Sequence, residues 1–352
     1  MRICRPLSWV CSINMCHRQS GLGHDVATSE GAAHEDCEWV APLLAKAARD
    51  NTMTTFLITG ASGMLGTDLQ RVLADHTVTA LDRTRLDVTD AAAVRAAVAG
   101  HDVVINAAAY TRVDDAETHE EEAHAINATG PLNLAVACRE VGARLVQVST
   151  DYVFRGSATT PYSENDPLDP LSAYGRTKAD GERNALREHP AGTYVVRTAW
   201  LYGQHGPNFA RTMLTLAARN DTLTVVDDQV GQPTWTLDLA RQIRALSESM
   251  APAGIYHGTN SGVTSWRGFA QAVLELAGLD PERVHPTDSS QFVRPAPRPR
   301  YSVLGHQAWR HAGIPELRGW REALATAFTD GAFNEALPVT TPPMSATTSA
   351  EA

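Results

Sequence analysis

Tyr174 and Lys178 lie four residues apart in the segment Y-G-R-T-K, and Thr150 ends an apolar run earlier in the chain. On an α-helix, residues four apart share one face, so the phenol and the ammonium would point into the same pocket. A positive charge close to a phenol favours tyrosinate and lowers a pKa that starts at about 10. We therefore predict that Tyr174 gives a proton to a substrate oxygen near neutral pH, and that Lys178 lowers its pKa.

The scarcity of lysine supports this prediction over a chance pair on a solvated helix. Of the 30 basic residues only Lys46 and Lys178 are lysines, and the others are arginines. A compact ammonium and a bulky guanidinium are not interchangeable in a binding site. Keeping one lysine at this position favours a catalytic role for it.

A glycine-rich segment follows the first apolar strand. Residues 55–59, T-F-L-I-T, are typical of a buried parallel strand, and Gly60, Gly63 and Gly66 lead into a helical stretch that ends near Leu73. Glycines at this spacing permit a tight turn, a close approach of the backbone to a pyrophosphate, and packing of the new helix. The helix N-terminus can then bind the phosphate charge, so the pattern predicts a dinucleotide site.

Two further segments would contribute to this site. The second strand ends at Asp82, where a dinucleotide fold places a carboxylate on the adenosine ribose, while Arg83 could instead face a 2′-phosphate. The choice between NADH and NADPH therefore stays open. After the third strand come the small residues Ala107, Ala108 and Ala109, and then Tyr110. They would let the backbone lie against the cofactor, although an ordinary strand end also uses alanine for packing.

The alternation of strands and helices predicts the fold class and the domains. It favours an α/β fold with a doubly wound parallel sheet, Rossmann-like, whose ligands gather at the carboxyl ends of the strands. We expect a dinucleotide-binding core with the catalytic helix at 53–203, and a smaller substrate-binding lobe, interleaved with the core, at 204–330. Residues 120–141 read as one long helix. We expect 1–52 to be a disordered or mis-assigned extension and 338–352 a disordered tail.

Composition excludes several classes of protein. The net charge is -10 with no long basic run, which argues against a nucleic-acid partner. No apolar run is long enough to span a membrane, and no signal peptide is recognisable, so we expect a cytoplasmic protein. Four of the five cysteines lie within the first 37 residues without a C-x-x-C pair, so no zinc site is expected.

The motifs together resemble a known family. G-A-S-G-M-L-G, N-A-A-A-Y, S-T-D-Y-V-F and Y-G-R-T-K resemble the extended short-chain dehydrogenase/reductases. Less common segments resemble the dTDP-4-dehydrorhamnose reductase family within that group: R-T-A-W-L-Y, D-D-Q-V-G-Q-P-T, T-S-W-R-G-F-A and R-P-R-Y-S-V-L. The resemblance covers about residues 54 to 328.

The resemblance implies a role for each candidate residue. Tyr174 would be the proton donor, Lys178 would hold the nicotinamide ribose, and Thr150 would polarise the substrate carbonyl. Asp151 and Trp200, with Thr150, would contact the sugar nucleotide, although Trp200 could equally be a core aromatic residue. The residues implied to contact the cofactor, besides Tyr174 and Lys178, are Gly60, Gly63, Met64, Leu65, Gly66, Asp82, Arg83, Asp87, Val88, Ala107, Ala108, Ala109 and Tyr110.

The implied reaction is transfer of a hydride from NADPH or NADH to C4 of dTDP-4-dehydro-6-deoxy-L-mannose. The product would be dTDP-L-rhamnose, a precursor of cell-surface polysaccharide, and no catalytic metal is required. Related enzymes include homodimers bridged by magnesium, so a dimer with Mg²⁺ at its interface stays open.

Two alternatives remain. A sugar-nucleotide dehydratase of this group needs an Asp-Glu pair directly after the threonine, but Tyr152 follows Asp151 here; an epimerase or another reductase is a related possibility. A non-catalytic regulatory subunit that keeps the dinucleotide fold is the alternative from another class. The presence of Thr150, Tyr174 and Lys178 argues against a regulatory subunit.

Overall fold

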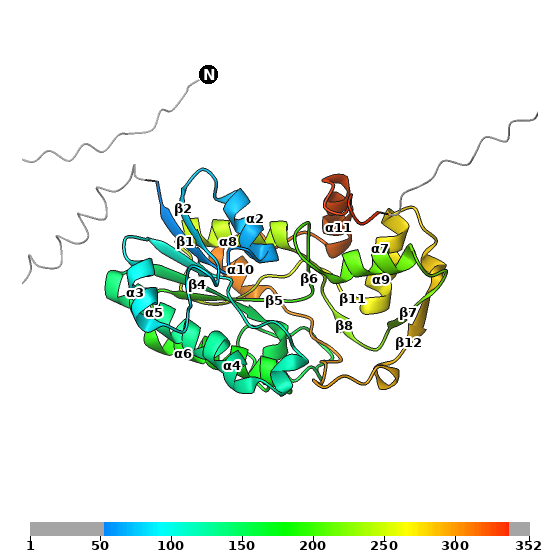
Figure 1. Ribbon diagram of the computed structural model, residues 1–352, viewed down its shortest axis with the longest axis horizontal. Coiled ribbons are helices and arrows are strands. Elements are labelled where there is room, and N and C mark those ends of the chain that lie inside the picture. Colours follow the sequence, from blue (N-terminus) through cyan, green and yellow to red (C-terminus); the bar gives the residue numbers. More distant parts are fainter. Residues whose placement is uncertain (1–52, 338–352) are drawn as a thin grey trace, which may run out of the picture. The chain divides into compact units, whose positions relative to one another are not determined.

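The computed structural model describes residues 53–337, so the predictions for residues 1–52 and 338–352 lie outside the described residues. A six-stranded sheet forms its centre, and every neighbouring pair of its strands is parallel (Figure 1). In spatial order the strands are β2 (Thr77–Leu81), β1 (Thr55–Thr59), β3 (Val103–Asn106), β4 (Arg144–Thr150), β5 (Thr193–Thr198) and β10 (Gly254–His257). The chain changes direction across the sheet between β1 and β3, which is where ligands bind in open α/β sheets.

Helices cover both faces of this sheet, which confirms the doubly wound fold (Figure 1). On β1, Phe56 and Ile58 point to one face and Leu57 to the other, because successive side chains alternate along a strand. All three are fully buried, as the uninterrupted apolar run predicted. The helices of the first face are α2 (Met64–Val72), α8 (Thr236–Glu248) and α10 (Gln307–Ala312). Those of the second are α3 (Ala91–Val98), α5 (Gly130–Val141) and α6 (Ala173–Glu188).

The long helix predicted at 120–141 is present, but its middle is π-helical rather than α-helical. The segment contains α4 (Glu120–His124), a π-helical turn (Ala125–Thr129) and then α5. Proline at the start of α5, Pro131, has no N–H to donate to the carbonyl of Asn127 four residues earlier, so a regular α-helix cannot continue through it. The turn leaves Asn127 directed at the neighbouring elements.

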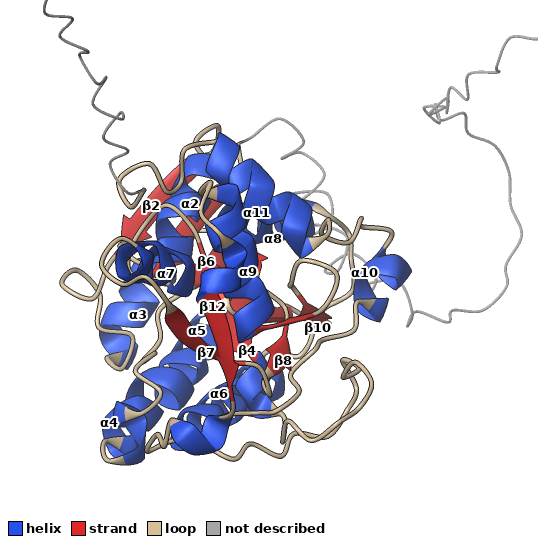
Figure 2. Cartoon of the chain, turned by 90° about the vertical axis from the view of Figure 1, so that its right-hand side faces the viewer, coloured by secondary structure: helices blue, strands red, loops and turns tan. Residues whose placement is uncertain are grey.

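The smaller lobe, with α7, α9 and α11, faces the viewer in Figure 2, and it has its own core. Tyr202, Leu214, Phe269 and Trp320 are buried together in it. Its strands form three short pairs, β6 with β9, β7 with β12, and β8 with β11. Its elements are β6 (Leu201–Tyr202), α7 (Phe209–Ala217), β7 (Leu223–Val226), β8 (Val230–Gly231), β9 (Thr234–Trp235), β11 (Thr264–Ser265), α9 (Trp266–Leu276), β12 (Val284–Thr287) and α11 (Trp320–Thr329).

Between these elements the chain returns to the main sheet to form α8, β10 and α10. The two parts are therefore interleaved in sequence. Short helical turns complete the description: η1 (Asp115–Glu117), η3 (Asp151–Val153), η4 (Pro281–Arg283) and η5 (Ser289–Gln291). No helix within residues 53–337 has the length and apolar character needed to cross a membrane.

Candidate active site

The loops that follow β1, β2 and β3 meet at the carboxyl edge of the sheet. Gly60 has a φ of +70°, and a Cβ added to it would lie 2.5 Å from the backbone nitrogen of Ala108. The backbone N–H of Ala61 donates to the carbonyl of Leu81 at 3.1 Å. These contacts join the glycine-rich loop to the loop of Ala107–Ala109 and to the end of β2, so the predicted cofactor segments lie side by side.

The start of α2 fits a pyrophosphate. Its N-cap is Gly63, no side chain caps the helix, and its first turn, with Met64 and Leu65, contains no acidic residue. The first N–H groups of such a helix are available to an anion. A Cβ on Gly66 would lie 2.3 Å from the carbonyl oxygen of Gly60, so the glycine is needed for the loop to pack on the helix.

Asp82 and Arg83 follow β2 directly. One oxygen of the Asp82 carboxylate accepts hydrogen bonds from the backbone and the hydroxyl of Thr84, and these bonds lower the pKa of Asp82. Arg83 is exposed beside it. A carboxylate and an exposed guanidinium thus stand where an adenosine ribose would lie.

Asp87 and Val88, predicted to contact adenine, lie in the loop before α3. The carboxylate of Asp87 accepts hydrogen bonds from the backbone and hydroxyl of Thr89, which lower its pKa. The side chain of Val88 is buried, and a Cβ added to Gly130 would lie 2.8 Å from it. Only the backbone of Val88 can therefore face a ligand.

Asn127 fixes the loop of Tyr110, a role that the sequence did not predict. Its amide accepts from the backbone N–H of Tyr110 at 2.8 Å and donates to the carbonyl of Tyr110 and the hydroxyl of Thr177, both at 3.1 Å. Thr177 lies on α6 between Tyr174 and Lys178. Asn127 thus joins the cofactor loop to the catalytic helix.

A chain of polar side chains crosses the sheet below this edge. The hydroxyl of Thr59 donates to Asn106 at 2.6 Å, and Asn106 donates to Gln147 at 2.7 Å. Gln147 donates to the carbonyl of Val148 at 2.8 Å, and the Lys178 ammonium donates to the same carbonyl at 2.7 Å. Lys178 is therefore held at a fixed point of the sheet.

Tyr174 and Lys178 lie on the same side of α6, as their spacing predicted. The helix begins with Ser172, whose hydroxyl caps it, and Tyr174 is in the first turn. Lys178 reaches Val148, while Tyr174 is hydrogen-bonded to Thr150, two residues further along β4. The three predicted catalytic side chains converge on the end of this strand.

The lowered pKa predicted for Tyr174 was wrong, and the cause is burial rather than Lys178. Burial raises the pKa of Tyr174 well above its ordinary value, and only the hydrogen bond with Thr150 opposes this. Burial also lowers the pKa of Lys178 to about 8, while the charge of Glu182 raises it.

Asp151 is buried next to Thr150. The Thr150 hydroxyl donates to its Oδ1 at 2.9 Å, and Ser302, from the segment R-P-R-Y-S-V-L, also bonds to the carboxylate. Its Oδ2 has no hydrogen-bond partner within the described chain. Burial raises the pKa of Asp151 to about 6, so a carboxyl with a free acceptor oxygen faces the site.

Three residues that the sequence did not predict stand beside Tyr174. The ring of Tyr152 contacts that of Tyr174 edge-on, with centroids 5.6 Å apart. The guanidinium of Arg298 lies 6.0 Å from the Tyr152 ring and is paired with Asp114 at 2.9 Å. Asp114 and Arg298 are so distant in sequence that no local pattern connects them.

Trp200 lies where the main sheet meets the smaller lobe. Its backbone φ is +47°, and its indole stacks on Trp266 with centroids 3.6 Å apart. A Cβ on Gly231 would lie 2.6 Å from the same indole. Protein therefore covers much of Trp200, although the side chain keeps some exposure.

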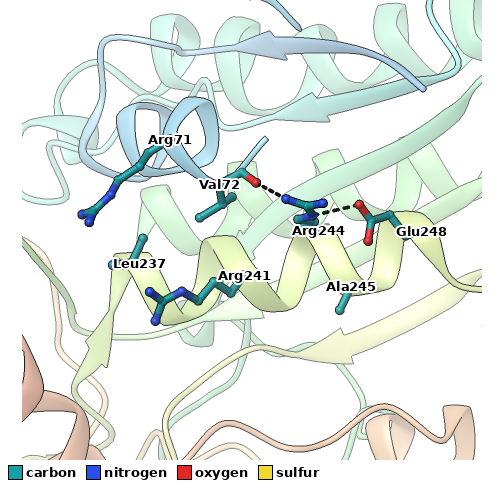
Figure 3. Close-up of a pocket in the computed structure, with 7 residues that line it drawn as sticks. All are labelled: Arg71, Val72, Leu237, Arg241, Arg244, Ala245 and Glu248. Carbon is teal, nitrogen blue, oxygen red and sulfur yellow. Dashed lines mark hydrogen bonds and ion pairs between the residues drawn. The ribbon is translucent and has the colours of Figure 1, made fainter. Parts of the chain in front are cut away.

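A separate polar hollow, between α2 and α8, contains none of the predicted site residues (Figure 3). It is lined by Arg71, Arg241, Arg244 and Glu248, among others. Arg244 is already paired there with Asp75 and Glu248. Among residues 53–337 no three His, Cys, Asp or Glu side chains gather to hold a metal, so the magnesium left open above gains no support.

Comparison with known proteins agrees with this arrangement. The family described as "RmlD substrate binding domain" matches residues 53–332. A dTDP-4-dehydrorhamnose reductase of Streptomyces griseus is 54% identical over 281 residues, which span 78% of this chain and 92% of that protein. A probable dTDP-4,6-dihydroxy-2-methyloxan-3-one 4-ketoreductase of Streptomyces antibioticus is 53% identical over 280 residues, spanning 78% and 95%.

A solved structure gives the same fold. The dTDP-4-dehydrorhamnose reductase of Bacillus anthracis, in complex with NADP, is 37% identical and superposes with a TM-score of 0.77 over 79% of this chain and 100% of that one. The chain therefore belongs to the dTDP-4-dehydrorhamnose reductase family, oxidoreductases of the extended short-chain dehydrogenase/reductase type.

Proposed function

We propose that the protein reduces the C4 keto group of dTDP-4-dehydro-6-deoxy-L-mannose to give dTDP-L-rhamnose. Beside the family membership, one observation supports this. Thr150, Tyr174 and Lys178 converge on the end of β4, at the same edge of the sheet as the glycine-rich loop. A proton donor therefore stands next to a site that fits a dinucleotide.

Tyr174 protonates the oxygen that becomes an alkoxide. Because burial raises its pKa, the phenol is present in the neutral form that can donate a proton. The Lys178 ammonium then stabilises the tyrosinate that remains. Thr150 turns its hydroxyl from Asp151 to the substrate oxygen, where charge develops in the transition state and where one donor is worth about 2.7 to 4 kcal/mol.

The cofactor would be held by the residues already described. Gly63, Met64 and Leu65 would bind the pyrophosphate, Asp82 or Arg83 the adenosine ribose, Asp87 and the backbone of Val88 the adenine, and Ala107 to Tyr110 the middle of the dinucleotide. Bound NADPH or NADH supplies the hydride. The exposed guanidinium of Arg83, and the engagement of Asp82 with Thr84, favour NADPH.

The substrate would lie between the two parts of the chain. We assign the cofactor mainly to residues 53–203 and the sugar nucleotide mainly to 204–330, with Asp151 and Trp200 contacting the sugar nucleotide. The homodimer expected from the resemblance stays a prediction, and sedimentation equilibrium measures it.

The test is an assay with the named sugar nucleotide and either NADPH or NADH, following the absorbance of the reduced nicotinamide and identifying the product. Tyr174→Phe should abolish turnover and leave the Kd of the dinucleotide nearly unchanged. Tyr256→Phe is the control, since its hydroxyl binds the carbonyl of Pro252 at the other edge of the sheet. Unchanged turnover in Tyr174→Phe would refute the role of Tyr174, and binding without oxidation by the wild type would favour a regulatory subunit.

A second candidate is reduction of a related dTDP-4-keto sugar. The 53% identity to the Streptomyces antibioticus ketoreductase favours it almost as strongly as the first candidate is favoured. Comparing kcat/KM over a panel of dTDP-4-keto-6-deoxy sugars separates the two. A higher kcat/KM for another sugar would make that sugar the substrate, while the reaction would still be reduction of a C4 keto group.

A further inference from the structure

An ion pair lies inside the protein, behind the site. Arg197 of β5 and Glu182 of α6 are each 1% exposed. The guanidinium Nη2 lies 2.7 Å from Glu182 Oε2, and its Nε lies 3.0 Å from Oε1, so the pair is bidentate. Burying two charges costs several kcal/mol per ion, which close pairing only partly offsets, and such a pair is therefore weak evidence for a role in stability alone.

Neutral groups complete the surroundings of Arg197. The imidazole of His257 donates from Nδ1 to the carbonyl of Gly305 at 2.9 Å, so its Nε2 can accept from Arg197 at 3.3 Å. Burial and the charge of Arg197 keep the pKa of His257 well below its ordinary value, so the ring is neutral. The carbonyl of Glu164 accepts a further bond, and the ring of Phe154 lies 4.9 Å from the guanidinium. Arg197 is thus fixed on all sides, and it fixes Glu182.

Lys178 is the second cation next to Glu182. The two residues are four apart on α6, so they share one face of the helix, and both are buried. Lys178 binds the carbonyl of Val148, and the next residue of that strand, Ser149, is paired in register with Arg197. Glu182 is therefore paired directly with the guanidinium, and its charge acts on the ammonium from the same face of α6.

The other titratable groups facing Lys178 do not replace Glu182. Tyr174, on the same helix, is neutral. Asp151, beyond the end of β4, bonds to Thr150 and Ser302, and His257 on β10 is neutral. The carboxylate of Glu164 is bound to the backbone N–H of Ala308 at 2.9 Å. An isolated ammonium in such surroundings would lose its proton rather than stay charged.

We infer that Glu182, held in place by Arg197 and His257, is a positioning residue that keeps the ammonium of Lys178 charged inside the closed site. The effect of Glu182 on turnover rests on the proposed function, but its effect on the charge of Lys178 does not. With Lys178 and Arg197 positive and Glu182 negative, this group reaches neutrality when Tyr174 gives up its proton. Glu182 thus leaves one net positive charge on the group, and this charge balances the tyrosinate that the proton transfer creates.

The amino-acid composition makes a direct test possible. The chain contains two lysines, Lys46 and Lys178, so protein labelled with ¹³C at lysine Cε gives two side-chain NMR signals, and Lys46→Arg assigns them. We expect the pKa of Lys178 in the wild type to be near 8. In Glu182→Gln it should fall by about one pH unit, because the opposite charge is lost.

Control variants separate charge from folding. Glu182→Asp keeps the charge and should keep the pKa of Lys178 close to that of the wild type. Glu188→Gln removes a carboxylate from the same helix that is paired with Arg139 and Arg187 at the surface, and should change nothing. If Glu182→Gln does not fold, the pKa of Lys178 in the wild type still tests the inference, because it needs no variant.

The titration of Lys178 tests the inference without any substrate. An unchanged pKa of Lys178 in a folded variant that lacks Glu182 overturns the inference, and so does a wild-type pKa far below neutrality, which needs no variant at all. With substrate, the basic limb of the pH profile of kcat/KM should move to lower pH in Glu182→Gln. If the titration shifts but no sugar nucleotide is turned over, the proposed function fails and the inference about Glu182 stands.

Discussion

At the scale of single residues, three candidate catalytic side chains meet at the end of β4, and burial sets the pKa values of two of them. Thr150, Tyr174 and Lys178 carry their signal in local spacing, which the helix and the strand preserve. The pKa of Tyr174 depends on how deeply the phenol is buried, which no spacing reports. Asn127 and Arg298 escaped prediction because each contacts the site from a distant part of the sequence.

Asp151 should make the stability of the protein fall as pH rises from about 4 to about 6. Its folded pKa of about 6 lies above the ordinary value of 3.8, so the folded state binds more protons in this range. Asp151→Asn should therefore be more stable than the wild type at pH 7, by roughly 2 to 3 kcal/mol. Urea unfolding at several pH values measures this difference, which should vanish below pH 4. A difference that is constant with pH would contradict the assignment.

At the scale of elements, the periodicity of the sequence predicted the order of strands and helices. The close contacts between these elements depend on glycines instead. The π-helical turn approaches α6 so closely that a Cβ on Gly181 would lie 2.0 Å from the carbonyl oxygen of Asn127. The loop after β4 also approaches α6 closely, because a Cβ added to Gly175 would lie 2.3 Å from the carbonyl oxygen of Tyr152. Glycines on a helix do not reveal which neighbour requires them, so the sequence did not predict these two close contacts.

Gly181→Ala should push α6 away from the π-helical turn. Because the contact is with backbone, we expect a loss of about 1 to 3 kcal/mol in the free energy of unfolding. Turnover should also fall, since Tyr174 and Lys178 move with the helix. Chemical denaturation and the reductase assay measure the two effects. Gly319→Ala, where a Cβ would meet nothing within 4 Å, is the control for turnover, which should stay unchanged although alanine is a poorer N-cap of α11 than glycine.

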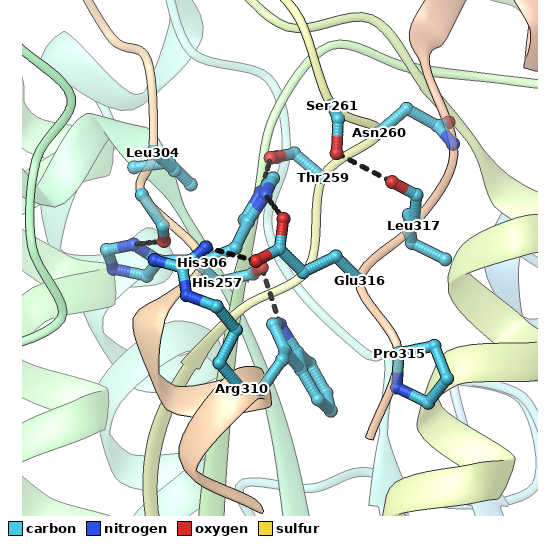
Figure 4. A network of polar contacts seen from close by, with 12 residues as sticks. His257, Thr259, Asn260, Ser261, Leu304, His306, Arg310, Pro315, Glu316 and Leu317 are labelled. Atoms are coloured by element: carbon cyan, nitrogen blue, oxygen red, sulfur yellow. Dashed lines mark hydrogen bonds and ion pairs between the residues drawn. The ribbon is translucent and has the colours of Figure 1, made fainter. Parts of the chain in front are cut away.

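At the scale of the whole molecule, polar contacts connect the smaller lobe to the sheet. The imidazole Nε2 of His306 is hydrogen-bonded to the hydroxyl of Thr259, just beyond β10, at 2.8 Å (Figure 4). Its Nδ1 lies 3.6 Å from the carboxylate of Glu316. Arg298 pairs with Asp114 near the cofactor loop. The sequence did not predict these long-range pairs, since ion pairs carry no periodic signal.

Asp114→Asn should loosen the segment around Arg298 without unfolding the protein. Asp114 also pairs with Arg294 at 3.4 Å, so the change weakens two contacts with that segment. Partly exposed ion pairs contribute little to stability, about 0 to 1 kcal/mol each, so Tm should change little. Hydrogen exchange of residues 289–300 should become faster. Asp169→Asn, which breaks a surface pair with Arg155, is the control, and equal exchange in all three proteins would contradict the prediction.

The stacked pair of Trp200 and Trp266 has an optical consequence. Two indoles whose planes are 9° apart and whose centres are 3.6 Å apart couple their electronic transitions. This pair joins the end of the main sheet to α9, so any shift between the two parts of the molecule alters the coupling. Near-ultraviolet circular dichroism of the unmodified protein should therefore change when a ligand moves Trp200 relative to Trp266, and stay constant when it does not.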